Sequence, residues 1–141
     1  MEAELGVSRE SRQLDRFSSL PNPRERGIAA EDAAEAYLRS LDYRIVERNL
    51  VTKLGEIDLV ALDGETLVFV EVKARTHRDY GDAIEAVRRR KQERLVRAAS
   101  LFLAKNRSKR ACRFDVVGLD RMEDGSWRIT LIRDAFPAFP A

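Results

Sequence analysis

Two apolar segments near the middle of the chain are interrupted by charged residues whose types and spacing could bind a metal ion. The first segment, residues 55–62, contains Asp58, and the second, residues 65–75, contains Glu71 and Lys73. Mg²⁺ takes oxygen ligands and is often held by one or two carboxylates together with waters and a substrate phosphate. Asp58 and Glu71 are therefore candidate ligands for Mg²⁺ or Mn²⁺, with Lys73 beside them.

A tight turn between the segments should bring these residues together. Asp63-Gly64 between two apolar runs predicts a β-hairpin, because Gly accepts the positive φ that such turns require. A loop of two residues would place Glu56 opposite Glu71, and a loop of four would place Asp58 opposite Glu71. Either loop leaves Asp58, Glu71 and Lys73 on one face, since side chains alternate along a strand; a loop of three would separate them.

The alternative is that these charges cover a solvated face of the hairpin. Three apolar residues are expected on that same face, Val60, Leu62 and Phe69. Facing carboxylates repel each other, and burying ionised ones is costly without a partner. An apolar face with acids and a lysine grouped at one end favours the edge of a cleft. Glu56 could support this site or simply lie near a turn.

A helix is predicted before the hairpin, over about residues 27–40. Its apolar stripe recurs at helical spacing and comprises Ala30, Ala34, Tyr37, Leu38 and Leu41. Glu31 lies at the border of this stripe. Taken alone, it is better explained as an anion in the first turn, where the helix dipole favours negative charge.

The remaining elements complete a mixed α/β pattern. We expect a strand over about 43–50, a loop over 76–82, a second helix from Asp82 to about Asn106, and two further strands over 113–119 and 126–132. The fold class is therefore α/β, a central mixed sheet flanked by helices in the order α-β-β-β-α-β-β. The expected divisions are a flexible tail over 1–26, one domain over 27–134 and a C-terminal tail over 135–141.

Basic residues crowd the first half of the second helix. They are Arg88, Arg89, Arg90, Lys91, Arg94 and Arg97, and Arg75 and Gln92 lie nearby in the sequence. Residues 75–110 hold twelve bases and four acids, whereas residues 31–74 hold ten acids and five bases. A solvated helix surface is one explanation. An acidic pocket beside a basic surface favours a polyanion as partner, and such clustering is typical of phosphate contacts.

Composition limits the remaining possibilities. The chain has 141 residues, a net charge of +2 and 44% hydrophobic residues, as expected for one soluble domain. Its apolar runs are too short to cross a bilayer, and the N-terminus lacks the pattern of a secretory signal. Cys112 is the single cysteine, and Cys112 with His77 is too few ligands for zinc. We expect a cytoplasmic protein with no membrane partner.

The segments around the candidate site resemble a known family. Asp58, the hairpin and Glu71-Val72-Lys73 are similar to the PD-(D/E)XK nuclease signature, in the order found in archaeal Holliday-junction resolvases. More closely, the chain resembles the bacterial YraN family of small predicted endonuclease-like proteins. The matching segments are residues 31–38, 47–49, 55–60, 69–75, 91–92 and 113–117. Ala30 departs from the Gly that this family usually has before the helical Glu.

The resemblance implies a nuclease fold and a metal-dependent attack on a phosphodiester. By this likeness Asp58 and Glu71 would hold Mg²⁺ or Mn²⁺, and Glu31 would bind the ion through water or hold a second one. Lys73 would orient or help deprotonate a water and contact the scissile phosphate. Lys91 or Gln92 would contact phosphate or water. Nucleic acid, with DNA favoured and branched DNA as one candidate, is the implied substrate.

Two other functions are compatible with the sequence. A non-catalytic nucleic-acid-binding module would explain the arginines from Arg88 to Arg97 without a metal, but gives no reason to collect three acids. A structural protein that binds a partner through its Pro-Phe tail is the weaker alternative. A homodimer would suit an enzyme that cuts two strands symmetrically.

Overall fold

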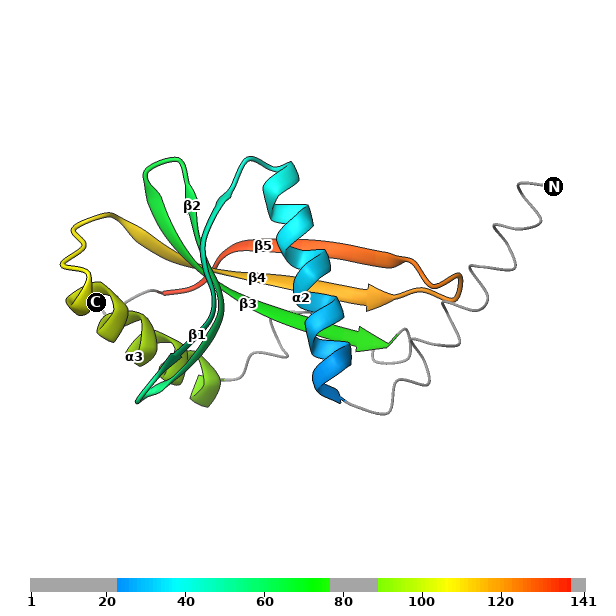
Figure 1. Ribbon diagram of the computed structural model, residues 1–141, viewed down its shortest axis with the longest axis horizontal. Coiled ribbons are helices and arrows are strands. Elements are labelled where there is room, and N and C mark those ends of the chain that lie inside the picture. Colours follow the sequence, from blue (N-terminus) through cyan, green and yellow to red (C-terminus); the bar gives the residue numbers. More distant parts are fainter. Residues whose placement is uncertain (1–22, 77–88, 138–141) are drawn as a thin grey trace.

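The computed structural model describes residues 23–76 and 89–137 (Figure 1). Its elements in chain order are α2 (Pro23–Ser40), β1 (Arg44–Thr52), β2 (Gly55–Asp63), β3 (Thr66–Thr76), α3 (Arg89–Lys105), β4 (Cys112–Arg121) and β5 (Trp127–Phe136). This α-β-β-β-α-β-β order is the predicted one. In the described residues, neither helix is long and apolar enough to cross a membrane.

The five strands form one mixed sheet in the order β1-β2-β3-β4-β5. Neighbouring strands are antiparallel except for β3 and β4, which are parallel. Parallel neighbours cannot be joined by a tight turn, and here the connection between them contains α3. The mixed sheet with its two helices confirms the predicted fold class and is consistent with a restriction-endonuclease-like fold.

Helix α2 begins at Pro23, earlier than the predicted residue 27. Proline suits the first helical position, because the amide hydrogen it lacks would have no partner there. The predicted stripe is confirmed at Ala30, Ala34 and Leu38, which are buried, but is wrong at Leu41, which is exposed. The helix has already ended, since Asp42 takes a left-handed φ of 67° and the Tyr43 N–H donates to Leu38 O.

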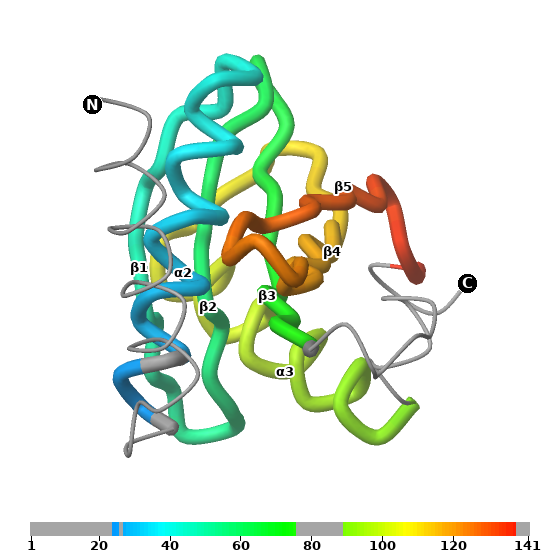
Figure 2. Tube along the Cα trace, turned by 90° about the vertical axis from the view of Figure 1, so that its right-hand side faces the viewer, coloured from blue at the N-terminus to red at the C-terminus, as the bar shows by residue number. Residues whose placement is uncertain are grey.

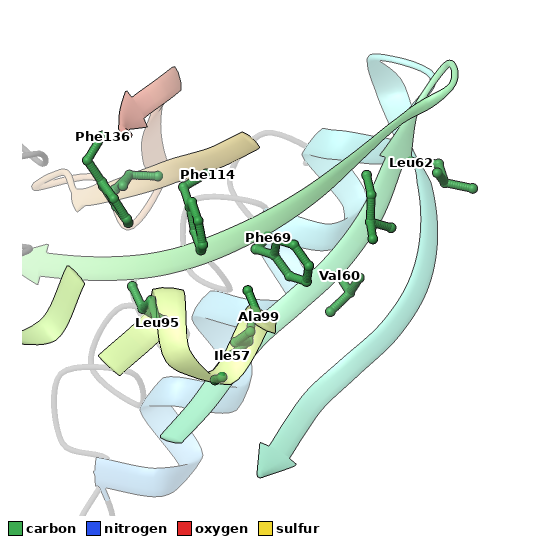
Figure 3. Close-up of a cluster of buried hydrophobic side chains, with 11 residues drawn as sticks. Ile57, Val60, Leu62, Phe69, Leu95, Ala99, Phe114 and Phe136 are labelled. Atoms are coloured by element: carbon green, nitrogen blue, oxygen red, sulfur yellow. The ribbon is translucent and has the colours of Figure 1, made fainter. Parts of the chain in front are cut away.

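Each helix covers one face of the sheet with its own apolar cluster (Figure 2). On the α2 face, Ala34 and Leu38 pack against strand residues such as Leu59 and Val70. On the α3 face, Leu95, Ala98 and Ala99 pack against Val60, Leu62, Phe69, Phe114 and Phe136 (Figure 3). The strand alternation predicted for Val60, Leu62 and Phe69 is therefore confirmed, because all three share the α3 face.

A buried polar cluster joins the start of β1 to β4 and β5. The fully buried Asp115 accepts a hydrogen bond of 2.8 Å from the Tyr43 hydroxyl and one of 2.9 Å from Arg113 Nε. Arg113 also reaches Asp63 at 2.7 Å, and the Asp134 N–H donates to Asp115 at 3.0 Å. The Asp115 carboxylate is thus satisfied inside the protein, so this cluster fixes the ends of four strands rather than offering a site.

Several expectations concern the ends of the elements. Helix α3 is described from Arg89, so the Asp82 cap and the loop after Thr76 lie outside the described residues, as does most of the 1–26 tail. Strand β5 ends at Phe136, past the boundary drawn at residue 134. Phe136 is buried and stacks on Phe114 with ring centroids 4.8 Å apart. The first residue of the Pro-Phe segment therefore belongs to the core.

Candidate functional site

Strands β2 and β3 part where the candidate ligands lie. The register pairs Leu62 with Leu67, which is the alternative that sets Asp58 opposite Glu71. Asp63 pairs with Thr66 as well, so the turn itself is Gly64-Glu65. The backbone ladder between the strands ends at Leu59 and Val70.

The Asp58 side chain replaces the next rung of that ladder. Its Oδ2 accepts a hydrogen bond of 2.8 Å from the backbone N–H of Val72. A carboxylate that satisfies a backbone donor at a strand separation is held in one orientation. Asp58 is therefore fixed between β2 and β3.

Glu71 lies beside Asp58 and is 4% exposed. The pKa of Asp58 is raised to about 7 by its burial and then by the negative charge of Glu71, with which it also shares a hydrogen bond. The Val72 N–H and the Lys91 ammonium oppose this shift. A buried carboxyl group beside a partly buried one favours either a shared proton or a bound cation.

A lysine from α3 supplies a positive charge to this pair. Lys91 Nζ lies 2.7 Å from Glu71 Oε2. Lys91, Leu95 and Ala98 follow i, i+4, i+7 spacing, so Lys91 lies on the helix stripe that faces the sheet. Among the predicted phosphate-binding residues that the structure describes, Lys91 is therefore the one that contacts the acidic pair.

Glu31 approaches the pair from α2. The pKa of its carboxyl is raised by burial and then by the charge of Asp58, and is lowered by a hydrogen bond from Asn49 and by Arg48. Because α2 begins at Pro23, Glu31 lies well inside the helix and does not cap its first turn. The first-turn interpretation is wrong, and Glu31 and Asp58 are instead electrostatic neighbours.

Asn49 is the site neighbour that residue-by-residue reasoning missed. In the β1–β2 register, Arg48 pairs with Leu59 and Leu50 with Ile57, which sets Asn49 opposite Asp58. Asn49 has a left-handed φ of 55°, a conformation that Asn tolerates better than most residues. This φ bends strand β1 and interrupts the alternation of its side chains. The consecutive residues Arg48 and Asn49 therefore both interact with Glu31.

Arg48 ties this bend to several acids on α2. Its Nη1 lies 2.6 Å from Asp32 Oδ1 and 3.3 Å from Glu35 Oε1, and its Nε lies 3.6 Å from Glu31 Oε1. A signal for both residues was present in the segment Glu47-Arg48-Asn49, which carried part of the family resemblance. Their spatial role required the positive φ, which no residue pattern in β1 specifies.

The remaining predicted site residues lie in different surroundings. Lys73 is partly exposed, and no described side chain lies within ion-pair distance of its ammonium. The Arg75 side chain is 10% exposed, with Nε 3.1 Å from Asp120 Oδ1, so a contact within the protein already engages it. Gln92 is partly buried beside Lys91, and Arg88 lies outside the described residues.

The exposed arginines of α3 form one stripe. Arg90, Arg94 and Arg97 follow i, i+4, i+7 spacing and lie on an exposed side of the helix beside the buried stripe. Arg89 is also exposed, and its Nε lies 3.7 Å from Glu93 Oε1. The first turn of α3 that the structure describes, from Arg89, contains no acid. A positive surface therefore begins beside the residue that contacts Glu71.

The donor set can be compared with what a divalent cation needs. Across residues 23–76 and 89–137, no three His, Cys, Asp or Glu side chains converge closely enough to hold a metal. Asp58 and Glu71 form a pair instead, and the pair already engages a cationic group, Lys91. Two buried carboxylates with waters and a substrate phosphate suffice for Mg²⁺, so the residues fit such an ion.

The fold, the acidic pair and the sequence relatives together define the class of this protein. It is a small α/β protein in which the buried Glu71 and the partly buried Asp58 lie together where two strands of a mixed sheet separate. A model of the uncharacterised protein family UPF0102 matches residues 30–119, more than half of the chain. The chain belongs to this family, and the likeness to YraN-type proteins is confirmed at that level.

Relatives match over most of their length. The UPF0102 protein STH1475 of Symbiobacterium thermophilum is 51% identical over 113 residues, which cover 79% of this chain and 96% of that protein. A UPF0102 protein of Pseudomonas aeruginosa is 44% identical over 127 residues, covering 88% and 98%. One of Halorhodospira halophila is 46% identical over 115 residues, covering 82% and 89%.

Proposed function

We propose that this protein is a metal-dependent nuclease that hydrolyses phosphodiester bonds of nucleic acid, with DNA as the favoured substrate. The observation that carries the proposal is the pairing of the partly buried Asp58 with the buried Glu71, in which burial and the charge of Glu71 raise the pKa of Asp58 to about 7. A fold gains no stability from burying two repelling acids, so such a pair is a candidate functional site.

The residues have distinct proposed roles. Asp58 and Glu71 would hold Mg²⁺ or Mn²⁺, with the Val72 carbonyl as a further oxygen ligand. The bound ion would lower the pKa of a water and offset the charge that develops on the phosphate. Lys73, which lies two residues beyond Glu71 on the same strand face, would orient the water and contact the phosphate. Glu31 would order waters at the edge of the pair.

The stripe of Arg90, Arg94 and Arg97 would bind the substrate backbone. Among the described residues these guanidinium groups form no ion pair, and they lie on the helix that also carries Lys91. Counterion release on contact with phosphates gives an arginine stripe affinity without sequence preference. Arg75 is omitted from this surface because Asp120 engages it.

A specific observation favours a second candidate function, a non-catalytic nucleic-acid-binding module. Lys91 Nζ already neutralises Glu71 at 2.7 Å, and no third acid completes the pair within the described residues. A binding module would need no metal and would keep this ion pair as part of its structure. A homodimer is compatible with either candidate.

The deciding experiment combines cleavage with metal titration. Labelled branched, duplex and single-stranded substrates are incubated with Mg²⁺ or Mn²⁺ and wild type, Asp58→Asn or Lys73→Ala, while Mn²⁺ is titrated into each protein by calorimetry. The nuclease proposal expects Asp58→Asn to lose both cleavage and Mn²⁺ binding. It expects Lys73→Ala to lose cleavage alone, because lysine is not a metal ligand.

A matched control lies on the same strand. Glu56 is exposed and two residues from Asp58, so Glu56→Gln makes the same change of charge without touching the pair. It should cleave and bind Mn²⁺ as wild type does. Equal Mn²⁺ binding by Asp58→Asn and wild type would disprove the metal site, and absence of cleavage on every substrate would favour the binding module.

A further inference from the structure

The turn between β1 and β2 exposes two large apolar side chains. Val51 is 69% exposed and Leu54 is 46% exposed, and Lys53 between them is also exposed. Single exposed apolar residues need no explanation, but two at the tip of one turn form a small apolar projection. We call residues 51–54 the β1–β2 tip.

The tip has a fixed conformation. Thr52 Oγ1 accepts hydrogen bonds of 3.1 Å from the N–H groups of Leu54 and Gly55 and donates one of 2.7 Å to Gly55 O. One threonine hydroxyl thus satisfies three backbone groups of the turn. The apolar side chains are therefore presented by a preorganised loop, which reduces the entropy lost when they bind a partner.

The tip also lies beside the basic helix. A Cβ added to Gly55 would meet the carbonyl oxygen of Arg94 at 3.3 Å, so the turn lies directly against α3. Figure 1 shows the end of β1 next to this helix. Arg94 is about one helical turn from Lys91, the residue that contacts Glu71. Helix α3 therefore connects the tip to the acidic pair.

The distance along β2 is short as well. Gly55 and Asp58 are three residues apart, about 10 Å at roughly 3.3 Å per residue. A nucleic-acid strand rises by about 3.4 Å per nucleotide, so this separation corresponds to about three nucleotides. A substrate bound along the arginine stripe would meet the tip within a few nucleotides of Asp58.

We propose that the β1–β2 tip inserts against unstacked bases, so that the site selects nucleic acid with a nick, branch or flap rather than continuous duplex. The inference rests on the proposed function. Apolar side chains such as Leu are known to wedge between base steps, and a step that is already interrupted costs less to open. Lys53 and the stripe of Arg90, Arg94 and Arg97 are positively charged, so they favour a nucleic acid over an apolar protein surface that carries few acids. Glu56 is a negatively charged residue near the turn.

The test measures binding in metal-free buffer, so it does not depend on cleavage. Wild type and the double variant Val51→Thr/Leu54→Ser are titrated into matched intact, nicked and four-way-branched DNA that carry 2-aminopurine at the interruption. Wild type should bind interrupted DNA about tenfold more tightly than intact duplex and increase the fluorescence. The double variant should lose both effects and keep its affinity for intact duplex.

Control variants keep the outcome interpretable. Val46→Thr removes an apolar side chain that is also exposed on β1, near the other end of the strand, and should behave as wild type. If the double variant unfolds, the single variant Leu54→Ser is used in its place. Leu54 bonds to Thr52 through its backbone N–H, so replacing its side chain leaves this bond of the turn intact.

The remaining outcomes overturn the inference in different ways. Equal preference for interrupted DNA in wild type and double variant would exclude the tip while leaving the proposed function in place. An equal loss of affinity for all three DNAs would make the tip a general contact. Absence of binding by wild type to all three DNAs would overturn both this inference and the proposed function on DNA, and would favour a protein partner for the tip.

Discussion

Lys91 Nζ lies 2.7 Å from Glu71 Oε2, so a helix residue neutralises the carboxylate that the sheet buries. The contact joins α3 to β3 at the point where β2 and β3 part. Glu71 is 4% exposed, whereas the Lys91 side chain is 43% exposed. The lysine can therefore leave for solvent, but the carboxylate cannot follow it. A bound divalent ion and the Lys91 ammonium would compete for one position beside Glu71.

Lys91→Met tests this competition. The variant keeps a side chain of similar length and removes the charge, so Mn²⁺ should bind about tenfold more tightly, since a charge-assisted hydrogen bond is worth about 1.5–3 kcal/mol. Without metal, the variant should be less stable than wild type because Glu71 loses its partner. Calorimetric Mn²⁺ titration and thermal unfolding measure the two effects. Lys73→Met is the control for the unfolding measurement, and unchanged or weaker Mn²⁺ binding by Lys91→Met would contradict the shared position.

Asp58 gives the metal-free protein a characteristic pH dependence of stability. Its folded pKa is raised from 3.8 to about 7, so between these values the folded state binds more protons than the unfolded state. The free energy of unfolding should therefore fall as pH rises from about 4 to about 7 and then level off. The total decrease should be a few kcal/mol, at most about 4. Urea unfolding at several pH values in chelator measures this change.

Two variants identify the group responsible. In Asp58→Asn, most of the decrease in the free energy of unfolding between pH 4 and pH 7 should be absent, and this variant should be more stable than wild type at pH 8. Glu56→Gln should keep the wild-type profile. Saturating Mn²⁺ should raise the free energy of unfolding of the wild-type protein at pH 8, because a ligand that binds the folded state stabilises it. A stability that rises over this pH range equally in wild type and Asp58→Asn would exclude the raised pKa.

Asn49 should be replaceable by glycine in structure but not in function. At its left-handed φ of 55°, Asn49→Ala should cost about 1–2 kcal/mol in the free energy of unfolding relative to Asn49→Gly. Both variants remove the amide that bonds Glu31, so both should weaken Mn²⁺ binding to a similar extent. Unfolding and titration separate these effects. Equal stability of the two variants would contradict the backbone requirement.

The arginine stripe predicts a particular salt dependence. Replacing Arg90 and Arg94 with Ala should weaken binding to all sequences alike and reduce the slope of log affinity against log salt by about two units. The double variant Lys105→Ala/Lys109→Ala removes the same charge at the other end of α3 and just beyond it. It should change the slope much less. A slope unchanged by the Arg90 and Arg94 replacements would show that the stripe is a solvated helix surface that does not contact phosphate.

The sequence alone determined the order of elements and the shared strand face of the central acids. Apolar periodicity distinguished helices from strands, and turn chemistry located the hairpin, because these signals are local. Side-chain alternation placed Asp58, Glu71 and Lys73 on one face for either even loop, but only the structure fixed the register, with Leu62 opposite Leu67. The apolar residues Leu95, Ala98 and Ala99 recur at helical spacing in the sequence, and they form the buried face of α3.

Only the tertiary structure decided what surrounds these acids. Lys91 could not be separated from its arginine neighbours in the sequence, because its role depends on where α3 packs against β3. The interaction of Glu31 with Asp58 required the position of α2 over the sheet, and the role of Asn49 required a positive φ in the middle of a strand. The sequence predicted that Arg75 binds phosphate, but the parallel pairing of β3 and β4 places Arg75 beside Asp120, with which it forms an ion pair. Each of these contacts joins residues distant in the chain, so it depends on packing geometry that local patterns do not contain.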